Sequence, residues 1–247
     1  MDKEWNKHSN ILQKRAQDFN INLNPEQLEL FKKYWLFLSE YNEHTNLVAS
    51  ADLETVIFKH FVDSLAIGLC KDLIEQDKAN KIIDIGIGGG FPGVPIVIAY
   101  PEWKLCAVDS VGKKTKFIEL LAQELNITDR VEIYTKRAED ILDKREKFDI
   151  AVSRAVSQLN TLSEYCLPFV KVGGYFVAYK AKGIETELEQ AQKAVSILGG
   201  EVEKVISYNL NDDIERNLIL IKKIKPTHPK YPRKAGIAKK QPLGINF

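Results

Sequence analysis

Apolar side chains recur at helical spacing through the first 75 residues. Asn24 followed by Pro25 predicts a helix start, because asparagine is a favoured N-cap and proline is favoured at the first helical position. That helix would carry on one face Leu28, Phe31, Trp35, Leu38 and Tyr41. Asp52 is a second candidate cap, and it precedes the apolar set Val56, Phe58, Phe61, Leu65 and Leu69. We expect an N-terminal helical cap whose aromatic stripe is part of a core rather than a base-stacking surface.

From Lys81 onward the pattern changes to short β-rich runs that alternate with helical segments. The runs predict strands at residues 81–85, 104–108, 130–134, 148–153 and 174–179. Helical patterns lie between them, and the first starts near Pro92 or Val94 and runs to Tyr100. Such alternation is typical of a parallel sheet with crossover helices on both faces.

The last two predicted strands have no helix between them. After a helix expected over residues 184–198, extended runs at 201–208 and 217–224 are separated by a polar turn at 209–213. Consecutive strands joined by a short turn pair antiparallel. A mostly parallel α/β sheet that ends this way resembles the seven-stranded sheet of class I (Rossmann-like) methyltransferases more than a dinucleotide-binding dehydrogenase domain. We divide the chain into an N-terminal helical cap (1–75), a methyltransferase domain (76–225) and a basic C-terminal tail (226–247).

Composition agrees with an ordinary globular protein. Hydrophobic residues make up 45% and charged residues 28% of the 247 positions. No apolar run reaches the roughly 18 residues of a membrane span, and the first residues lack the order of a signal peptide, so we expect a cytoplasmic protein without a membrane partner. The three cysteines are widely spaced and the four histidines show no ligand spacing. Neither disulfides nor a metal site is expected.

Charge is unevenly distributed along the chain. The net charge is +1, yet residues 217–247 hold no acidic residue and eight basic ones, among them Arg233 and Lys234. A basic tail suits contacts with nucleic-acid phosphates. A solvated, frayed C-terminus is the alternative, and the basic run alone leaves both open.

A glycine loop follows the first predicted strand and is the main candidate for chemistry. Gly86, Gly88 and Gly90 alternate after Asp84, so the backbone can turn sharply and come close to a ligand. A strand that ends in such a loop is the first βα turn of a nucleotide-binding α/β fold. Glycines that only form a tight turn are the alternative.

Two cofactors compete for this loop. Residues 88–93 satisfy the G-x-G-x-x-G string of dinucleotide sites, with Asp109 placed to bind ribose hydroxyls, so an NAD-dependent oxidoreductase is one hypothesis. S-adenosylmethionine is favoured because the carboxylate of Asp84 suits a cationic ligand and because Pro92 has no N–H for a phosphate. Residues 136–140 would lie near the adenine. Asp109 could also cap the next helix, and Glu139 and Asp140 could be a solvated turn.

Several segments resemble one family, the bacterial 16S ribosomal RNA guanine-N7 methyltransferases, also called glucose-inhibited division protein B. They are residues 84–95, 109–114, 137–139, 153–155, 41–42 with 46–47, 59–65 and 231–236. Phe91, where the family also accepts leucine, and Val48, where threonine is common, depart slightly. The resemblance implies that S-adenosylmethionine is the cofactor, that small-subunit ribosomal RNA is the partner, and that the cofactor is contacted at Gly86, Phe91, Ala138, Glu139 and Arg154. With the loop, we expect Asp84, Gly88 and Asp109 to complete the cofactor site.

The residues after the fourth strand bear on the target atom. The run Ser153-Arg154-Ala155-Val156 lacks the Asn/Asp-Pro-Pro-aromatic motif of amine methylation, and Cys166 is not in a Pro-Cys pair that would attack a pyrimidine. Guanine N7 is a lone-pair nucleophile without a proton, so no catalytic acid or base is expected. His60, Lys180 and Lys182 are candidates for holding RNA beside the site, together with Arg233 and Lys234 of the tail. A packed histidine and solvated lysines are the alternatives, and a non-catalytic RNA-binding assembly factor is a third hypothesis. No obligate protein partner is evident.

Overall fold

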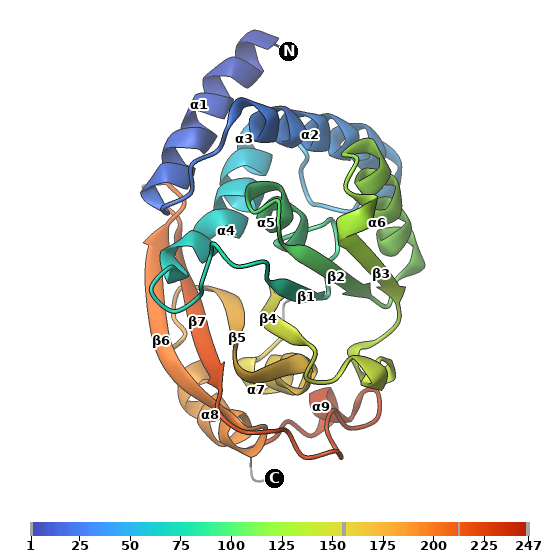
Figure 1. Ribbon diagram of the computed structural model, residues 1–247, viewed down its shortest axis with the longest axis vertical. Coiled ribbons are helices and arrows are strands. Elements are labelled where there is room, and N and C mark those ends of the chain that lie inside the picture. Colours follow the sequence, from blue (N-terminus) through green and yellow to red (C-terminus); the bar gives the residue numbers. More distant parts are fainter. Residues whose placement is uncertain (1, 155–156, 212, 246–247) are drawn as a thin grey trace.

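The computed structural model describes residues 2–154, 157–211 and 213–245. Within them, seven strands form one sheet in the order β3-β2-β1-β4-β5-β7-β6 (Figure 1). The strands are β1 (Lys81–Ile85), β2 (Lys104–Asp109), β3 (Val131–Thr135), β4 (Phe148–Ser153), β5 (Val170–Ala181), β6 (Gly200–Asn209) and β7 (Glu215–Lys223). Neighbours from β3 to β5 are parallel, and β7 is antiparallel to both β5 and β6. The predicted mostly parallel sheet with an antiparallel end is confirmed.

The order of the strands changes direction between β1 and β4. β2 and β3 extend the sheet on one side of β1, while β4 and β5 extend it on the other. In register, Asp84 of β1 is level with Ala107 of β2 and Val152 of β4. A crevice opens at the carboxyl ends of the strands at such a point, and open α/β sheets bind ligands there. The fold therefore directs a ligand to the ends of β1, β2 and β4.

Alternating side chains of the central strands enter two cores, one on each face of the sheet. Ile82, Leu105 and Val152 belong to the core that includes residues of α5 (Gly93–Ala99) and α6 (Gly112–Glu124). Ile83 and Cys106 belong to the core that includes residues of α7 (Leu159–Cys166) and α8 (Glu185–Ile197). Helices thus cover both faces, as predicted.

The N-terminal cap is helical, as expected, and joins the first of these cores. It comprises α1 (Asp2–Asp18), α2 (Pro25–Thr45), α3 (Leu53–Thr55), the π-helix η1 (Val56–Val62), α4 (Asp63–Leu65) and the 3-10 helix η2 (Ala66–Cys70). The side chain of Asn24 accepts from Gln27 N at 2.8 Å and the Gln27 side chain accepts from Asn24 N at 2.9 Å, a capping box. Phe31, Tyr34 and Leu38 of α2 are buried, so the aromatic stripe is core. The division of the chain into three units stays a prediction.

Several strand boundaries differ from those predicted, most of all the start of β5. β5 begins at Val170, which pairs with Phe148, and pairing resumes at Tyr175 after two glycines. These glycines break the apolar pattern without ending the strand. β3 begins at Val131 because the preceding residues form the 3-10 helix η3 (Thr128–Arg130). Three further 3-10 helices are η4 (Ala138–Asp140), η5 (Leu142–Lys144) and η6 (Leu167–Phe169).

The C-terminal tail is folded rather than frayed over its described part. After β7 it returns along α7 and forms the short helix α9 (Ile237–Lys240), with Tyr231 and Ala238 buried (Figure 1). Lys223, counted among the basic residues of this region, is fully buried and donates to Leu167 O and Thr227 Oγ1, each at 2.6 Å. Burial lowers the pKa of Lys223 to about 8. The alternative of a frayed terminus is wrong for the described residues.

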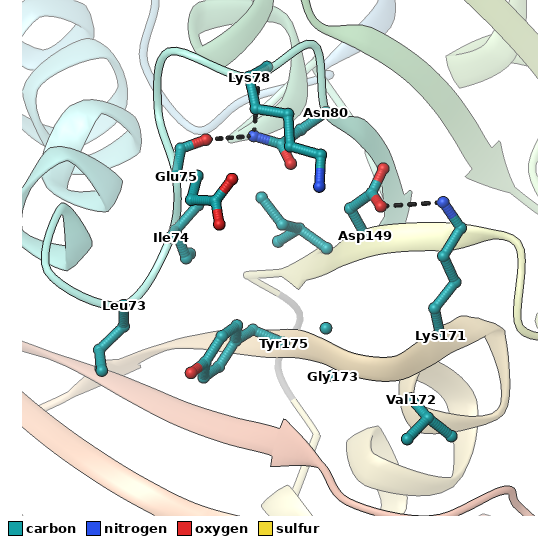
Figure 2. Close-up of a pocket in the computed structure, with 12 residues that line it drawn as sticks. Leu73, Ile74, Glu75, Lys78, Asn80, Asp149, Lys171, Val172, Gly173 and Tyr175 are labelled. Atoms are coloured by element: carbon teal, nitrogen blue, oxygen red, sulfur yellow. Dashed lines mark hydrogen bonds and ion pairs between the residues drawn. The ribbon is translucent and has the colours of Figure 1, made fainter.

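A cavity of about 410 Å³ opens at the amino ends of β4 and β5, opposite the glycine loop (Figure 2). Its charged groups are partly used by the fold: Asp149 Oδ1 accepts from Lys171 Nζ at 2.9 Å and Asp149 Oδ2 from Lys81 N at 2.8 Å. None of the predicted site residues lines it. Elsewhere in the described residues, no group of three or more His, Cys, Asp or Glu side chains could hold a metal ion, and no helix could cross a membrane.

Candidate functional site

The glycine loop joins β1 to α5 and is tied to the end of β2. Gly86 N and Ile87 N donate to Val108 O at 2.8 and 3.1 Å, and Gly88 N donates to Asp109 Oδ2 at 3.1 Å. At Gly90, where φ is +100°, a Cβ would lie 2.2 Å from Tyr34 Oη. Tyr34 Oη itself donates to Gly89 O at 2.6 Å. The glycine at position 90 therefore lets helix α2 of the cap press directly on the loop.

Asp84 lies fully buried beneath this loop. Its Oδ2 accepts from Gly93 N at 2.8 Å, whereas Oδ1 has no hydrogen-bond partner among the described residues. Burial raises the pKa of Asp84 to about 7, against the lowering effects of the Gly93 N–H and the Arg154 charge. A buried carboxyl group with one unpartnered oxygen would be stabilised by a cation or a donor on a ligand. Contact between Asp84 and a cofactor stays a prediction.

A cavity of about 200 Å³ lies beside the loop, at the carboxyl ends of β1 and β2. The predicted cofactor residues that line it are Gly86, Asp109, Ala138 and Glu139, together with residues that were not predicted, including Ser110, Leu162 and Tyr165. Asp109 Oδ1 accepts from Val111 N at 3.0 Å, but Val111 itself is the N-cap of α6, so the alternative that Asp109 caps this helix is wrong. Glu139 is buried, so the alternative of a solvated turn is wrong for Glu139, although Asp140 is exposed.

A larger cavity, of about 800 Å³, lies at the carboxyl ends of β4 and β5, and Ser157 lines both cavities. Four predicted site residues meet there, namely His60, Arg154, Lys180 and Lys182. Lys59, Arg216 and Lys239 line it too and were not predicted as site residues. Lys59 lay in a segment that carried the family resemblance, and Lys239 in the basic tail, but position 216 had no signal in the sequence. Ala155 and Val156, which follow Arg154, lie outside the described residues.

Arg154 links the end of β4 to the N-terminal cap. Its Nη1 donates to Lys59 O at 2.8 Å and to Asp63 Oδ2 at 2.9 Å, while its Nη2 lies 3.0 Å from His60 Nδ1. Asp63 Oδ1 in turn accepts from Tyr208 Oη at 2.6 Å. The π-helix η1 and helix α4 thus hold the guanidinium at the mouth of the larger cavity. A contact between Arg154 and the cofactor rests on the resemblance and stays a prediction.

His60 is a packed, neutral histidine. Its ring stacks on Phe91 at 4.6 Å between centroids, and burial, followed by the charge of Arg154, lowers the pKa of His60 to about 3. His60 is therefore uncharged at neutral pH and would offer RNA a ring or a hydrogen bond rather than a positive charge. His60 is packed, as the alternative interpretation expected. A contact between His60 and RNA stays a prediction.

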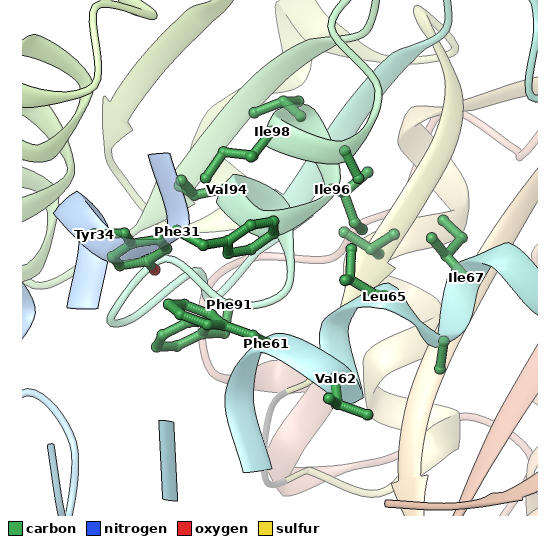
Figure 3. Packing of buried hydrophobic residues seen from close by; sticks show 14 of the residues in the cluster. Phe31, Tyr34, Phe61, Val62, Leu65, Ile67, Phe91, Val94, Ile96 and Ile98 are labelled. Carbon is green, nitrogen blue, oxygen red and sulfur yellow. The ribbon is translucent and has the colours of Figure 1, made fainter. Parts of the chain in front are cut away.

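The ring of Phe91 belongs to the core. It stacks on Tyr34 with ring centroids 5.2 Å apart and lies near Phe61 (Figure 3). It lines neither cavity. A contact between Phe91 and the cofactor rests on the resemblance and stays a prediction.

The lysines and the arginine predicted to hold RNA differ in their availability. Lys180 Nζ donates to Ser157 O and Glu187 Oε1, each at 2.6 Å, whereas Lys182 is exposed without a hydrogen bond or ion pair in the described chain. Arg233 lines neither of these two cavities, because its guanidinium is bound to the buried carboxylate of Glu164 at 2.6 Å. Lys234 is exposed and also lies outside both cavities. The structure thus gives Arg233 a partner within the protein, and contacts of Arg233 and Lys234 with RNA remain untested.

Comparison with known proteins agrees with this geometry. The family model described as rRNA small subunit methyltransferase G matches residues 27–219. Ribosomal RNA small subunit methyltransferase G of Acetivibrio thermocellus is 44% identical over 98% of this chain and 100% of its own length. The protein of the same name from Alkaliphilus oremlandii is 46% identical over 94% of this chain and 98% of its own length.

A solved structure supports the fold independently of the sequence. It comes from Galdieria sulphuraria and is described as a sarcosine dimethylglycine methyltransferase; it matches with a TM-score of 0.51 and 11% identity over 66% of this chain and 88% of that one. At this identity the likeness bears on the fold alone. The family, by contrast, is shown by its model and by relatives that match nearly end to end. The chain belongs to the rRNA small subunit methyltransferase G family.

Proposed function

We propose that this protein methylates N7 of a guanine in 16S ribosomal RNA, with S-adenosylmethionine as donor in the smaller cavity and the guanosine in the larger one. The reaction would take place in the cytoplasm on the small ribosomal subunit or its RNA, without an obligate protein partner. Membership of a methyltransferase family disfavours the NAD-dependent oxidoreductase. The choice of N7 as the target atom is supported by the described ionisable groups around the larger cavity, none of which is placed to act as a general base.

The acidic groups in and beneath the smaller cavity complement the positive charge of the methyl donor. S-adenosylmethionine supplies a methyl group on a positively charged sulfonium and also carries an amine and ribose hydroxyls. Asp84 has an unpartnered buried oxygen beneath the loop, and Asp109 and Glu139 line the cavity. Carboxylates next to a cationic ligand are favourable, whereas a pyrophosphate would be repelled.

None of the described acids of the larger cavity is placed to act as a general base. Asp63 is bound by Arg154 and Tyr208, and Glu187 is bound by Lys180. The low pKa of His60, about 3, makes it a weak base. A target that must lose a proton would need such a group. Guanine N7 has a free lone pair, so the protein would contribute mainly alignment and binding, worth several kcal/mol when the reacting atoms are held in line.

The wall of the larger cavity suits an RNA backbone. Lys59, Lys182 and Lys239 are exposed, and Arg216 is half-buried beside them. Such cations bind phosphates without regard to sequence, so they would position the RNA while the cavity selects the base. Binding should therefore weaken as salt concentration rises.

Mass spectrometry of 16S RNA nucleosides from a deletion strain tests the proposal. We expect one N7-methylguanosine to be lost and to return when the gene is supplied in trans. Purified protein should then transfer labelled methyl groups to 16S RNA or small subunits from the deletion strain, whereas RNA from the parent strain, already methylated, is the matched control. An unchanged content of N7-methylguanosine in the deletion strain would exclude the proposed reaction and favour the RNA-binding assembly factor.

A further inference from the structure

The C-terminal segment 231–243, here called the strap, passes along α7 (Figure 1). Its Lys239 and Pro242 line the larger cavity. Its Gly236 N donates to Glu139 Oε1 at 3.3 Å, and Glu139 lines the smaller cavity. One short segment therefore touches both places where the proposed reactants would bind.

The strap is anchored by an ion pair in the interior. Glu164 of α7 is fully buried, and its two oxygens accept from Arg233 Nε at 2.9 and 3.2 Å, from Arg233 Nη2 at 2.6 Å and from Arg233 N at 2.8 Å. Arg233 Nη2 also donates to Gln241 O at 2.8 Å, which closes the strap on itself. A forked guanidinium–carboxylate pair defines orientation as well as distance. The anchor thus sets where residues 234–241 run.

The backbone of the strap is the hydrogen-bond partner of Glu139 in the described chain. Gly236 is the N-cap of α9 and has φ +83°, a left-handed conformation that turns its N–H toward Glu139. Two residues later, Ala238 O accepts from Thr161 Oγ1 of α7 at 3.3 Å. Glu139 would otherwise have rotamer freedom at the cavity wall, because it sits in a single 3-10 turn.

We propose that Arg233 and Glu164 are positioning residues of the methyl-donor site, since their ion pair fixes the strap and the strap orients the Glu139 carboxylate. This inference rests on the proposed function, in which Glu139 contacts the donor. It gives the basic tail a second role beside any contact with RNA, because the tail holds a side chain of the donor cavity's wall in place.

Calorimetry of S-adenosylhomocysteine binding to the full chain tests this role. We expect Arg233→Met to weaken binding roughly tenfold, since a displaced strap leaves Glu139 unoriented, and Arg233→Lys to weaken it less because the charge remains while the fork is lost. Glu164→Gln, which keeps the shape of the side chain, should also weaken the binding of S-adenosylhomocysteine. Lys225→Met is the control, because it removes the same charge from an exposed position just before the tail and outside both cavities.

A double-mutant cycle with Glu139→Gln separates positioning from a merely structural role. If Arg233 acts through Glu139, Arg233→Met should weaken binding little further in the Glu139→Gln background. Thermal unfolding of each variant shows whether the fold persists, and the affinity is measured on folded protein, so a loss of stability alone would leave the dissociation constant unchanged. Unchanged affinity in folded Arg233→Met and Arg233→Lys, with weakened affinity in Glu139→Gln, overturns the inference and leaves the proposed function intact. If the wild type does not bind the ligand, or Glu139→Gln binds it unchanged, the proposed donor site itself is wrong.

Discussion

Among single residues, Asp84 has a carboxyl group whose burial is energetically unfavourable. It is fully buried, and only one of its oxygens has a partner among the described residues. Burial outweighs the favourable effects of Gly93 N–H and Arg154 and raises the pKa of Asp84 to about 7. In the ligand-free protein the charged form is therefore disfavoured, and a cation bound beside the carboxyl would favour the charged form and lower the pKa of Asp84.

The raised pKa of Asp84 predicts a pH-dependent stability. The folded state holds the proton more tightly than the unfolded state, so Asp84 lowers the free energy of unfolding as pH rises from about 4 to 7, by on the order of 4 kcal/mol from the pKa of about 7. Asp84→Asn cannot ionise, so its stability relative to the wild type should increase over that interval and level off above it. Urea unfolding of the ligand-free proteins across this range measures the difference, and parallel pH profiles would contradict the assigned pKa.

At the scale of elements, the cap helices place the site as much as the sheet does. Helix α2 presses Tyr34 on the glycine loop, and the π-helix η1 presents Lys59 and His60 to Arg154. A π-helix widens the backbone turn, and such turns are frequent at functional sites. The apolar spacing after Asp52 predicts a helix in this region but does not distinguish a π-helix from an α-helix.

The capping box at the start of α2 should have a measurable effect on stability. Asn24→Ala removes the acceptor for Gln27 N, and we expect a loss of about 1 kcal/mol in the free energy of unfolding. Glu29→Ala, an exposed change on the same helix, is the matched control and should alter stability by less than about 0.5 kcal/mol. Equal effects of the two substitutions in denaturant titrations would show that the cap bond does not contribute.

At the scale of the whole molecule, the cap and the sheet share one hydrophobic core. Phe31 and Leu38 of α2 lie in the same cluster as Ile82 and Leu105 of the sheet. Gln27 of α2 also donates to Ile98 O and Ala99 O of α5, each at 2.9 Å. Elements that bury their apolar faces against each other are expected to unfold together.

Tryptophan fluorescence can test this coupling, because the three tryptophans are divided between the two parts. Trp5 and Trp35 stack in the cap with centroids 6.1 Å apart, and Trp103 is buried beside the sheet. Fluorescence of the Trp103→Phe variant reports on the cap, and fluorescence of the Trp5→Phe/Trp35→Phe double variant reports on the sheet. For each variant, we expect the unfolding transition measured by fluorescence to coincide with the transition measured by circular dichroism. Two separated transitions within one variant would instead favour a cap that folds independently.

The amino-acid sequence is sufficient to predict the features of this protein that depend on local pattern. Alternating strands and helices, the Asn24 cap and the glycine loop after Asp84 follow from periodicity, backbone chemistry and spacing along the chain, and the structure contains them. The family was also accessible, because its motifs lie within short segments. These features require no knowledge of which distant residues meet.

The combination of distant side chains at the site depends on how the chain folds in three dimensions. Arg154 meets Asp63 across 91 residues, Arg233 meets Glu164 across 69, and Gly236 meets Glu139 across 97. Charge in the sequence indicated a free basic tail, but a buried carboxylate binds its arginine because an unpaired charge in the interior would be costly. Whether a cation serves RNA or the fold depends on the partner that folding brings to it, and spacing along the chain does not contain that partner.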